Sequence, residues 1–227
     1  MYDVIKRYES VSDEIIHAFE AVHESASVNE CLSRNGALNH EFRPVWPGVH
    51  AVGRAFTVQA RPGDNLILQK ALTMLSPLDF VIVTCDGFQE SGGMWGGIMS
   101  NAAQVQGAVG LVIDGCVRDT MMMKKIGFPV WSRGISVKRS TKRTPGTINH
   151  PIVIGNVCIH PGDLIVADND AVVAVPRQEA KEVLKKVLER EKSEEETLKH
   201  VRQNGAYLFA RYGFDKAYAE LGLSEEP

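Results

Sequence analysis

The sequence lacks a long uninterrupted apolar run and any strong excess of charge of one sign. No segment is apolar over the length needed to cross a bilayer, and the opening residues MYDVIKRYESVSDE have no apolar stretch typical of a secretory signal. We therefore expect no membrane partner and a cytoplasmic location. The 25 basic and 28 acidic residues give a net charge of −3, so there is no global electrostatic reason to expect a nucleic-acid partner.

The cysteines and histidines show none of the common site spacings. Cys31, Cys85, Cys116 and Cys158 are widely scattered without a C-x-x-C motif, so reduced and mostly buried thiols are expected rather than disulfides or a zinc site. The histidines lack H-x-x-x-H spacing and no G-x-S-x-G motif occurs, which argues against a zinc protease and a serine hydrolase. With 227 residues, 44% of them hydrophobic, the chain can bury a substantial core.

Hydrophobic periodicity predicts that helices and buried strands alternate through much of the chain. The expected elements are a helix at 11–22, a second short helix in SASVNECLSRNGAL at 25–38 that Gly36 ends, a strand at 51–60, a helix at 65–75, a strand at 79–84, a helix at 98–107, a strand at 109–114, a helix at 120–126 and a strand at 129–132. This alternation is typical of an α/β core with a largely parallel central sheet.

The last third of the chain shows a different sequence pattern. Strand signals broken by turn residues run from about 148 to 176, and a β-rich layer is therefore expected to join the α/β core. A long charged amphipathic helix is expected over 178–203, followed by a short terminal helix over 205–223. No internal repeat or low-complexity linker is visible, so we predict a single domain over 1–227 whose helical tail comprises 178–227.

A glycine-rich segment, GGMWGG at 92–97, lies between a predicted strand and a predicted helix. Glycines let the backbone come close to a ligand, and the first turn of a helix offers unpaired N–H groups at the positive end of its dipole. The segment is therefore a candidate carboxylate or phosphate site. It matches neither a Walker loop nor G-x-G-x-x-G, and a purely structural turn is the alternative interpretation.

Arg118 and Asp119 follow the next apolar strand, in IDGCVRD at 113–119. Ligand sites in open α/β sheets favour the carboxyl ends of the strands, so both side chains are expected beside the glycine-rich segment. Arginine can bind a carboxylate through two hydrogen bonds, and aspartate can hold a hard divalent cation that keeps several waters. The alternative is a surface ion pair at the start of the next helix.

Two charged stretches are less specific. The segment WSRGISVKRSTKRTPG contains five cations: Arg133, Lys138, Arg139, Lys142 and Arg143. A solvated loop and a surface that steers acidic substrates are both open interpretations of this basic stretch. The tail helix contains a cluster of glutamates over 189–196. Most of them are expected to be solvated or paired with neighbouring bases, while one could reach across a subunit boundary.

Six motifs follow one another along the chain: RPVWPG at 43–48, PGDN at 62–65, GLVIDGCVRD at 110–119, GFPVWSR at 127–133, PGDLIVADNDAVVAVPR at 161–177 and EREKSE at 189–194. With them the chain resembles the class II pyruvate aldolases that cleave 4-hydroxy-4-methyl-2-oxoglutarate and 4-carboxy-4-hydroxy-2-oxoadipate. These aldolases are relatives of the regulator of ribonuclease activity A. The resemblance covers nearly the whole chain.

The resemblance implies a fold, an assembly and an activity. The implied fold is a swivelling β/β/α-type domain with a C-terminal helical tail, assembled as homotrimers or homohexamers with active sites between neighbouring subunits. The implied activity is metal-dependent retro-aldol cleavage of 4-hydroxy-2-oxo dicarboxylates to pyruvate, with oxaloacetate decarboxylation through the same enolate. In this family the arginine corresponding to Arg118 binds the 2-oxo acid, and the aspartate corresponding to Asp119 ligates magnesium or manganese.

The resemblance also implies further contacts to the substrate. Backbone N–H groups of the glycine-rich segment bind the substrate carboxylate in the family, and the corresponding residues are Gly96, Gly97, Ile98 and Met99. A glutamate from the neighbouring subunit's C-terminal helix enters the family's active site. Glu194 matches this catalytic position better than Glu191.

The chain departs from the family pattern at Gly97. The active aldolases carry an aspartate there, twenty residues before the Arg-Asp pair, which is expected to hold waters of the metal shell. Two alternatives to an aldolase therefore stay open. One is a non-catalytic regulator that binds a ribonuclease. The other is a related lyase or tautomerase for a different 2-oxo acid, in which Met94, Trp95 and Met99 line an apolar pocket instead of belonging to the core.

Overall fold

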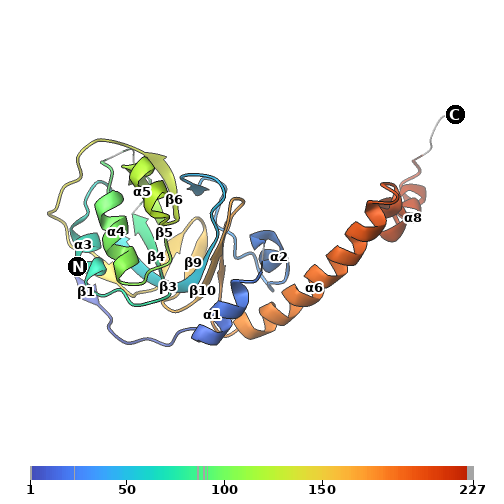
Figure 1. Cartoon of the computed structure of the whole chain (residues 1–227), viewed down its shortest axis with the longest axis horizontal. Coiled ribbons are helices and arrows are strands. Elements are labelled where there is room, and N and C mark those ends of the chain that lie inside the picture. Colours follow the sequence, from blue (N-terminus) through green and yellow to red (C-terminus); the bar gives the residue numbers. More distant parts are fainter. Residues whose placement is uncertain (1, 23, 86, 89, 91, 224–227) are drawn as a thin grey trace. The chain divides into compact units, whose positions relative to one another are not determined.

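The computed structural model describes residues 2–22, 24–85, 87–88, 90 and 92–223 (Figure 1). The chain divides into two compact units, Met1–Leu184 and Lys185–Pro227, which we call unit 1 and unit 2. In the described residues no helix is both long enough and apolar enough to cross a membrane. All four cysteines are free thiols, and Cys85 and Cys116 are buried. The expectation of mostly buried thiols holds for these two, whereas Cys31 is half-buried and Cys158 is exposed.

Unit 1 is built on a nine-stranded sheet whose centre is parallel. Its four central strands pair in parallel and lie in chain order: β3 (Ala51–Ala60), β4 (Asp79–Cys85), β5 (Gly110–Val117) and β6 (Val130–Ile135). Short strands extend the sheet at both sides: β1 (Asp3–Val4), β2 (Arg43–Pro44), β7 (Thr147–Ile148), β10 (Leu164–Ala167) and β11 (Val172–Val175). The expected α/β core with a largely parallel sheet is confirmed.

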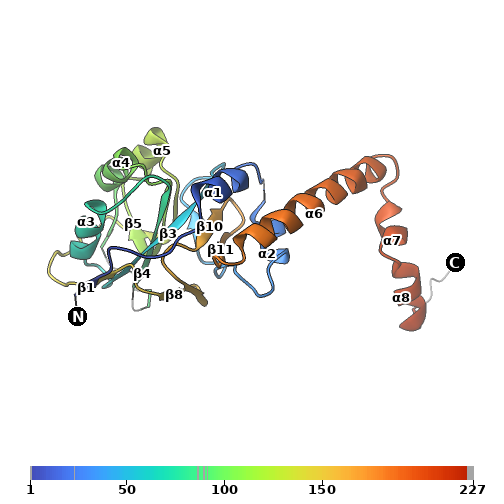
Figure 2. The ribbon, with the colours of Figure 1, turned by 90° about the horizontal axis from the view of Figure 1, so that it is seen from below.

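The central strands are buried on both faces, which explains why their sequences read as continuous apolar runs. Val81 and Leu111 belong to the core on one face, and Phe80 and Val112 to the core on the other. The first face is covered by helices α3 (Leu66–Leu72), α4 (Gly97–Val105) and α5 (Thr120–Ile126) (Figure 2). The opposite face is covered by the hairpin of β8 (Ile152–Ile154) and β9 (Val157–Ile159).

The β-rich segment joins the α/β core as expected, mostly through the main sheet itself. Strands β7 and β10 both pair with the long strand β3, and of the described strands of this segment only β8 and β9 pair apart from the main sheet. The two helices expected in the first helical region are confirmed as α1 (Asp13–Phe19) and α2 (Ser25–Glu30), and α2 ends before the expected stop at Gly36. Helix α1 begins after Ser12, whose hydroxyl accepts the Ile15 N–H at 3.4 Å as an N-cap.

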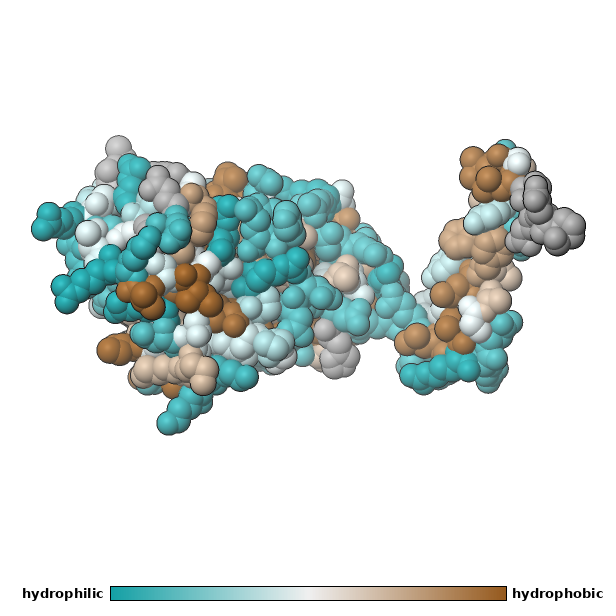
Figure 3. All heavy atoms as spheres, turned by 90° about the horizontal axis from the view of Figure 1, so that it is seen from above, coloured by the Kyte–Doolittle hydropathy of each residue, from teal (hydrophilic) through white to brown (hydrophobic). Residues whose placement is uncertain are grey.

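Unit 2 is helical. It contains most of α6 (Ala180–Val201), followed by α7 (Tyr207–Arg211) and α8 (Phe214–Glu220). The single terminal helix expected over 205–223 is wrong, because Gly213 has a φ of 67° and a left-handed residue ends a right-handed helix. Phe209 contacts Tyr218 across this turn with ring centroids 5.3 Å apart. Several apolar side chains of unit 2 stay on its surface (Figure 3).

Candidate active site

The Arg-Asp pair and the glycine-rich segment are neighbours at the carboxyl edge of the parallel strands. Strand β5 ends at Val117 and places Arg118 and Asp119 directly after this edge. The glycine-rich segment runs beside the end of the strand, because the Met94 N–H donates to the Cys116 carbonyl at 2.8 Å and the Arg118 N–H donates to the Trp95 carbonyl at 2.9 Å. The sequence predicted that these two motifs would meet, and the structure brings them together.

Asp119 adopts a backbone conformation that is rare for a residue with a side chain. Its φ is 61° and its ψ is 36°, in the left-handed region, where a residue with a Cβ atom is strained by about 1–2 kcal/mol. The strain is offset by the start of α5, since the Asp119 carbonyl accepts the N–H groups of Met122 at 2.9 Å and Met123 at 3.1 Å. Strained residues of this kind cluster at functional sites.

The Asp119 carboxylate lies between a cation and a helix N-terminus. Its Oδ2 atom accepts the Gly97 N–H at 3.3 Å and lies 3.8 Å from Arg118 Nε. Gly97 is the first residue of α4, so the carboxylate is close to the positive end of that helix dipole. The N–H groups of Ile98 and Met99 belong to the same first turn, which leaves them without carbonyl partners inside the helix.

The glycines of the segment make room for the protein itself. A Cβ atom at Gly92 would lie 2.4 Å from the Arg139 carbonyl oxygen, and one at Gly93 would lie 2.5 Å from the Ser136 carbonyl oxygen. A Cβ at Gly96 would lie 2.6 Å from Asp119 Oδ2. The sequence pattern indicated that something lies close to the backbone of these glycines. At Gly92 and Gly93 this is a backbone carbonyl of the loop after β6, and at Gly96 it is the Asp119 carboxylate.

Gly97, where the resemblance leads one to expect an aspartate, has no space for a side chain. A Cβ atom there would lie 2.5 Å from Met122 Sδ and 2.7 Å from Met122 Cγ. The side chain of Met122 on α5 therefore fills the space that a side chain at position 97, the first residue of α4, would need.

Most of the residues predicted to form the site line one cavity of about 240 Å³. Its walls include five of them: Gly96, Ile98, Met99, Arg118 and Asp119. Gly97 contributes its N–H to Asp119 but is not a wall residue. Met94, Trp95 and Met99 belong to the buried core and also line the cavity, so both interpretations of these apolar residues apply.

Sequence reasoning missed three polar residues of this cavity, Asn65, Gln69 and Lys142. Asn65 is 5% exposed, and its amide nitrogen donates to the Met94 carbonyl at 3.0 Å. Its amide oxygen has no hydrogen-bond partner among the residues that the structure describes. The signal for Asn65 was the PGDN motif at 62–65, which marked the family without indicating a role. Lys142 was part of the basic stretch, where nothing distinguished it from its neighbours.

The donor atoms of the cavity fit a hard divalent cation. In the described part of the chain no group of three or more His, Cys, Asp or Glu side chains is arranged to hold a metal. Among the described wall residues Asp119 is the one carboxylate, and the unpartnered oxygen of Asn65 lies in the same wall. One carboxylate and one amide oxygen suit magnesium or manganese, because these ions prefer oxygen ligands, keep several waters and need only one or two protein carboxylates.

Glu194, the remaining predicted catalytic residue, lies on α6 in unit 2. Its Oε1 atom forms an ion pair with Arg190 Nη2 at 2.8 Å, one helical turn away. The approach of this carboxylate to the site of a neighbouring subunit concerns other copies of the chain and stays a prediction, as does the position of residues 178–227 at a subunit interface.

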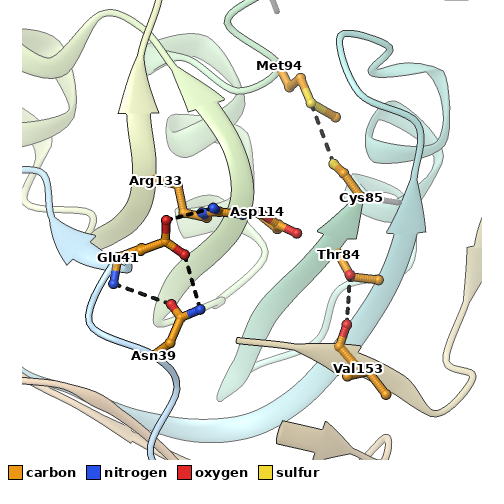
Figure 4. Close-up of polar contacts among 8 residues, drawn as sticks. All are labelled: Asn39, Glu41, Thr84, Cys85, Met94, Asp114, Arg133 and Val153. Carbon is orange, nitrogen blue, oxygen red and sulfur yellow. Dashed lines mark hydrogen bonds and ion pairs between the residues drawn. The ribbon is translucent and has the colours of Figure 1, made fainter. Parts of the chain in front are cut away.

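A second cavity, of about 440 Å³, lies on the β8–β9 face of the sheet, with Thr84, Asp114 and Arg133 in its wall (Figure 4). Arg133, the first cation of the basic stretch, is paired with two carboxylates here. Its guanidinium donates to Asp114 Oδ1 and to Glu41 Oε1, each at 2.8 Å, and lies 4.5 Å from the centre of the Phe88 ring. One guanidinium thus bridges two carboxylates, and this ion-pair network ties β5 and β6 to the segment before β2.

The chain is similar in sequence and in fold to known proteins. The model of the RraA-like family, described as Aldolase/RraA, matches residues 10–174. A protein of Halalkalibacterium halodurans named "Putative 4-hydroxy-4-methyl-2-oxoglutarate aldolase" is 33% identical over 177 residues, which are 78% of this chain and 84% of that protein.

Two solved structures share the fold over most of the chain. An uncharacterized protein from Pseudomonas syringae pv. tomato str. DC3000 superposes with a TM-score of 0.81 at 28% identity, over 91% of this chain and 97% of that one. Streptomyces coelicolor RraAS2, described as an unusual member of the RNase ES inhibitor RraA protein family, superposes with a TM-score of 0.75 at 25% identity, over 84% and 98%. By the family match and these similarities, the chain belongs to the RraA-like family.

Proposed function

We propose that the chain is a divalent-metal-dependent carbon–carbon lyase that cleaves 4-hydroxy-2-oxo dicarboxylates to pyruvate by retro-aldol chemistry. The observation that carries this proposal is the meeting of Arg118, Asp119 and the first turn of α4 on one small cavity. The name of the relative from Halalkalibacterium halodurans supports an aldolase. The same enolate chemistry extends the proposal to oxaloacetate decarboxylation.

The residues of the cavity suit the charge that develops in this reaction. Retro-aldol cleavage breaks the bond between C3 and C4 of the substrate, leaves the electron pair on the pyruvate fragment as an enolate and removes the proton of the 4-hydroxyl. A magnesium or manganese ion held by Asp119 would supply Lewis-acid stabilisation of the enolate oxygen. The Arg118 guanidinium adds a fixed positive charge beside it, and the first-turn N–H groups of α4 hold the substrate carboxylate.

The base for the 4-hydroxyl proton is missing from the described cavity wall. Asp119 is its one carboxylate, and the wall contains no histidine among the residues that are described. We propose that Glu194 of a neighbouring copy fills this role, in a homotrimer or homohexamer with the site between subunits. Glu194 is accessible for it, since its side chain is 42% exposed and its partner Arg190 lies on the same helix.

Pyruvate release tests the proposal. The purified chain is incubated with 4-hydroxy-4-methyl-2-oxoglutarate, with 4-carboxy-4-hydroxy-2-oxoadipate and with oxaloacetate, in Mg²⁺, in Mn²⁺ and in EDTA, and pyruvate is coupled to NADH oxidation. We expect metal-dependent release, and a loss of roughly 10²-fold or more in Arg118→Ala and Asp119→Ala. The matched controls are Arg139→Ala and Asp170→Asn, at positions outside the cavity wall. Release from none of these compounds would refute the lyase.

A second candidate is a regulator that binds a ribonuclease. The description of the similar Streptomyces coelicolor protein and the glycine at position 97 favour it. The two functions separate in Asp119→Ala. A lyase loses metal binding in this variant, which a titration with Mn²⁺ followed by electron paramagnetic resonance detects without any turnover. A regulator inhibits a ribonuclease equally well with either residue.

A further inference from the structure

The loop after β6 brings one exposed lysine, Lys142, to the wall of the candidate active-site cavity. Residues 136–146 pass beside the glycine-rich segment, where the Gly93 N–H donates to the Lys138 carbonyl at 2.9 Å. Of the five cations in the basic stretch, Lys142 is the one that lines the cavity with Arg118 and Asp119. Throughout the described ranges, no carboxylate forms an ion pair with its ammonium group, whereas Lys138 pairs with Glu90 at 3.0 Å.

A buried aspartate fixes this part of the loop. Asp64 Oδ2 accepts the Thr141 hydroxyl at 2.7 Å, the Arg143 N–H at 2.7 Å and the Thr144 N–H at 3.1 Å. Burial disfavours the charged carboxyl, but hydrogen bonds outweigh it and hold the pKa of Asp64 below its ordinary value. Since Thr141 and Arg143 flank Lys142, the backbone of the lysine is held on both sides while its side chain stays free.

Two cations therefore line the cavity, Arg118 and Lys142, and in the described part of the chain a carboxylate pairs with only one of them. Arg118 Nε lies 3.8 Å from Asp119 Oδ2, so its charge is partly balanced, while the charge of Lys142 is not. At about 240 Å³ the cavity is smaller than those that hold drug-sized ligands, and it suits a short acid. Lys142 is exposed and lines the same wall, so an acid whose first carboxylate binds at α4 and Arg118 has an unpaired cation on the cavity wall beside its other end.

We infer that Lys142 binds the second carboxylate of a dicarboxylic 2-oxo acid and thereby determines the specificity of the site. This inference rests on the proposed function, which places the first carboxylate of the substrate at the N-terminus of α4. Asp64 is a positioning residue in this arrangement, because it touches the loop and not the cavity, and its hydrogen bonds decide where Lys142 lies. A substrate with a single carboxylate would leave the ammonium group without a partner.

Binding of two acids that lack a 4-hydroxyl tests this inference independently of turnover. Isothermal titration calorimetry with Mg²⁺ present compares 2-oxoglutarate, which has the second carboxylate, with 2-oxopentanoate, which does not. We expect the parent to prefer 2-oxoglutarate. Lys142→Met should weaken 2-oxoglutarate binding by roughly 10-fold at low ionic strength and leave 2-oxopentanoate binding within about 2-fold. Lys142→Arg should keep the preference, and Lys138→Met is the matched control on the same loop.

Asp64→Asn adds a readout that a general loss of structure would not give. We expect it to reduce the preference for 2-oxoglutarate while binding of 2-oxopentanoate stays, because the loop and not the α4 end of the site is disturbed. Equal preference in the parent and in Lys142→Met overturns the inference, as does a parent that binds neither acid. A parent that prefers 2-oxoglutarate, loses this preference in Lys142→Met and releases no pyruvate would refute the lyase and leave the role of Lys142 standing.

Discussion

Gly97→Asp tests whether Met122 has taken the space of a side chain at position 97. A Cβ atom there would lie 2.5 Å from Met122 Sδ, 2.7 Å from Cγ and 2.9 Å from Cβ, so the methionine must move before an aspartate fits. Over-packing of this kind costs about 1–3 kcal/mol. The new carboxylate gains about 0.3–1 kcal/mol at the N-terminus of α4 but stands beside Asp119. We expect a net loss of about 1–2 kcal/mol in the free energy of unfolding.

A double-mutant cycle isolates the contact. Met122 is 40% exposed, so Met122→Ala alone should cost less than about 1 kcal/mol. In the double variant it should recover most of the loss caused by Gly97→Asp, with a coupling energy of about 1 kcal/mol or more. Urea unfolding followed by circular dichroism measures all four chains. Met121, which is 83% exposed on the same helix, supplies the control Gly97→Asp/Met121→Ala, where the effects should add.

The reasoning is refuted if Gly97→Asp and Met122→Ala add to within about 0.5 kcal/mol, because the two positions would then not share a volume. The same double variant reports on function. A carboxylate at position 97 would stand next to Asp119, whose Oδ2 already accepts the N–H of residue 97. We therefore expect the double variant to bind Mn²⁺ more tightly than the parent in an electron paramagnetic resonance titration.

Three further predictions concern single residues. Burial raises the pKa of Asp79 to about 6 from 3.8, so its contribution to stability is complete below pH 4 and is lost as the pH rises through 6. Asp79→Asn should gain about 3 kcal/mol relative to the parent between pH 4 and pH 7.5 in urea unfolding, and a difference between the two chains that does not change with pH would contradict this. Asp119→Gly should abolish pyruvate release and raise the melting temperature by about 2–4 °C, since glycine is unstrained at a φ of 61°; an unchanged or lower temperature would contradict this. Arg133→Met should cost about 3 kcal/mol because it leaves Asp114 unpaired, with pyruvate release per folded molecule unchanged.

The meeting of Arg118 and Asp119 with the glycine-rich segment could be predicted because it follows from local patterns. Buried strands show as apolar runs, and parallel strands bring their carboxyl ends to one edge. The end of β5 was placed at 114 instead of Val117, because the polar and small residues Asp114 and Gly115 interrupt the apolar run. The structure keeps them in the strand through a register shift against β6 between Ile113 and Cys116.

The place of Lys142 in the cavity could not be predicted from the sequence. It depends on the bonds between Asp64 and a loop 77 to 80 residues later in the chain. No periodicity reports such a contact, and the five cations of the basic stretch look alike. The complementarity of Gly97 and Met122 is hidden for the same reason, because a glycine in the sequence does not show which neighbour fills the space beside it.

The charge balance of the proposed complex gives an independent reason for a residue from a second copy. Arg118 and Lys142 together exceed Asp119 by one positive charge on the cavity wall. A divalent cation and a dicarboxylate dianion cancel each other, so loading the site leaves this excess unchanged. Charges in a small cavity are stable when they are paired, and one added carboxylate restores neutrality. In the proposed assembly, Glu194 of a neighbouring copy would supply this charge after leaving its ion pair with Arg190, at a place where the described wall also lacks a carboxylate or histidine base for the 4-hydroxyl proton.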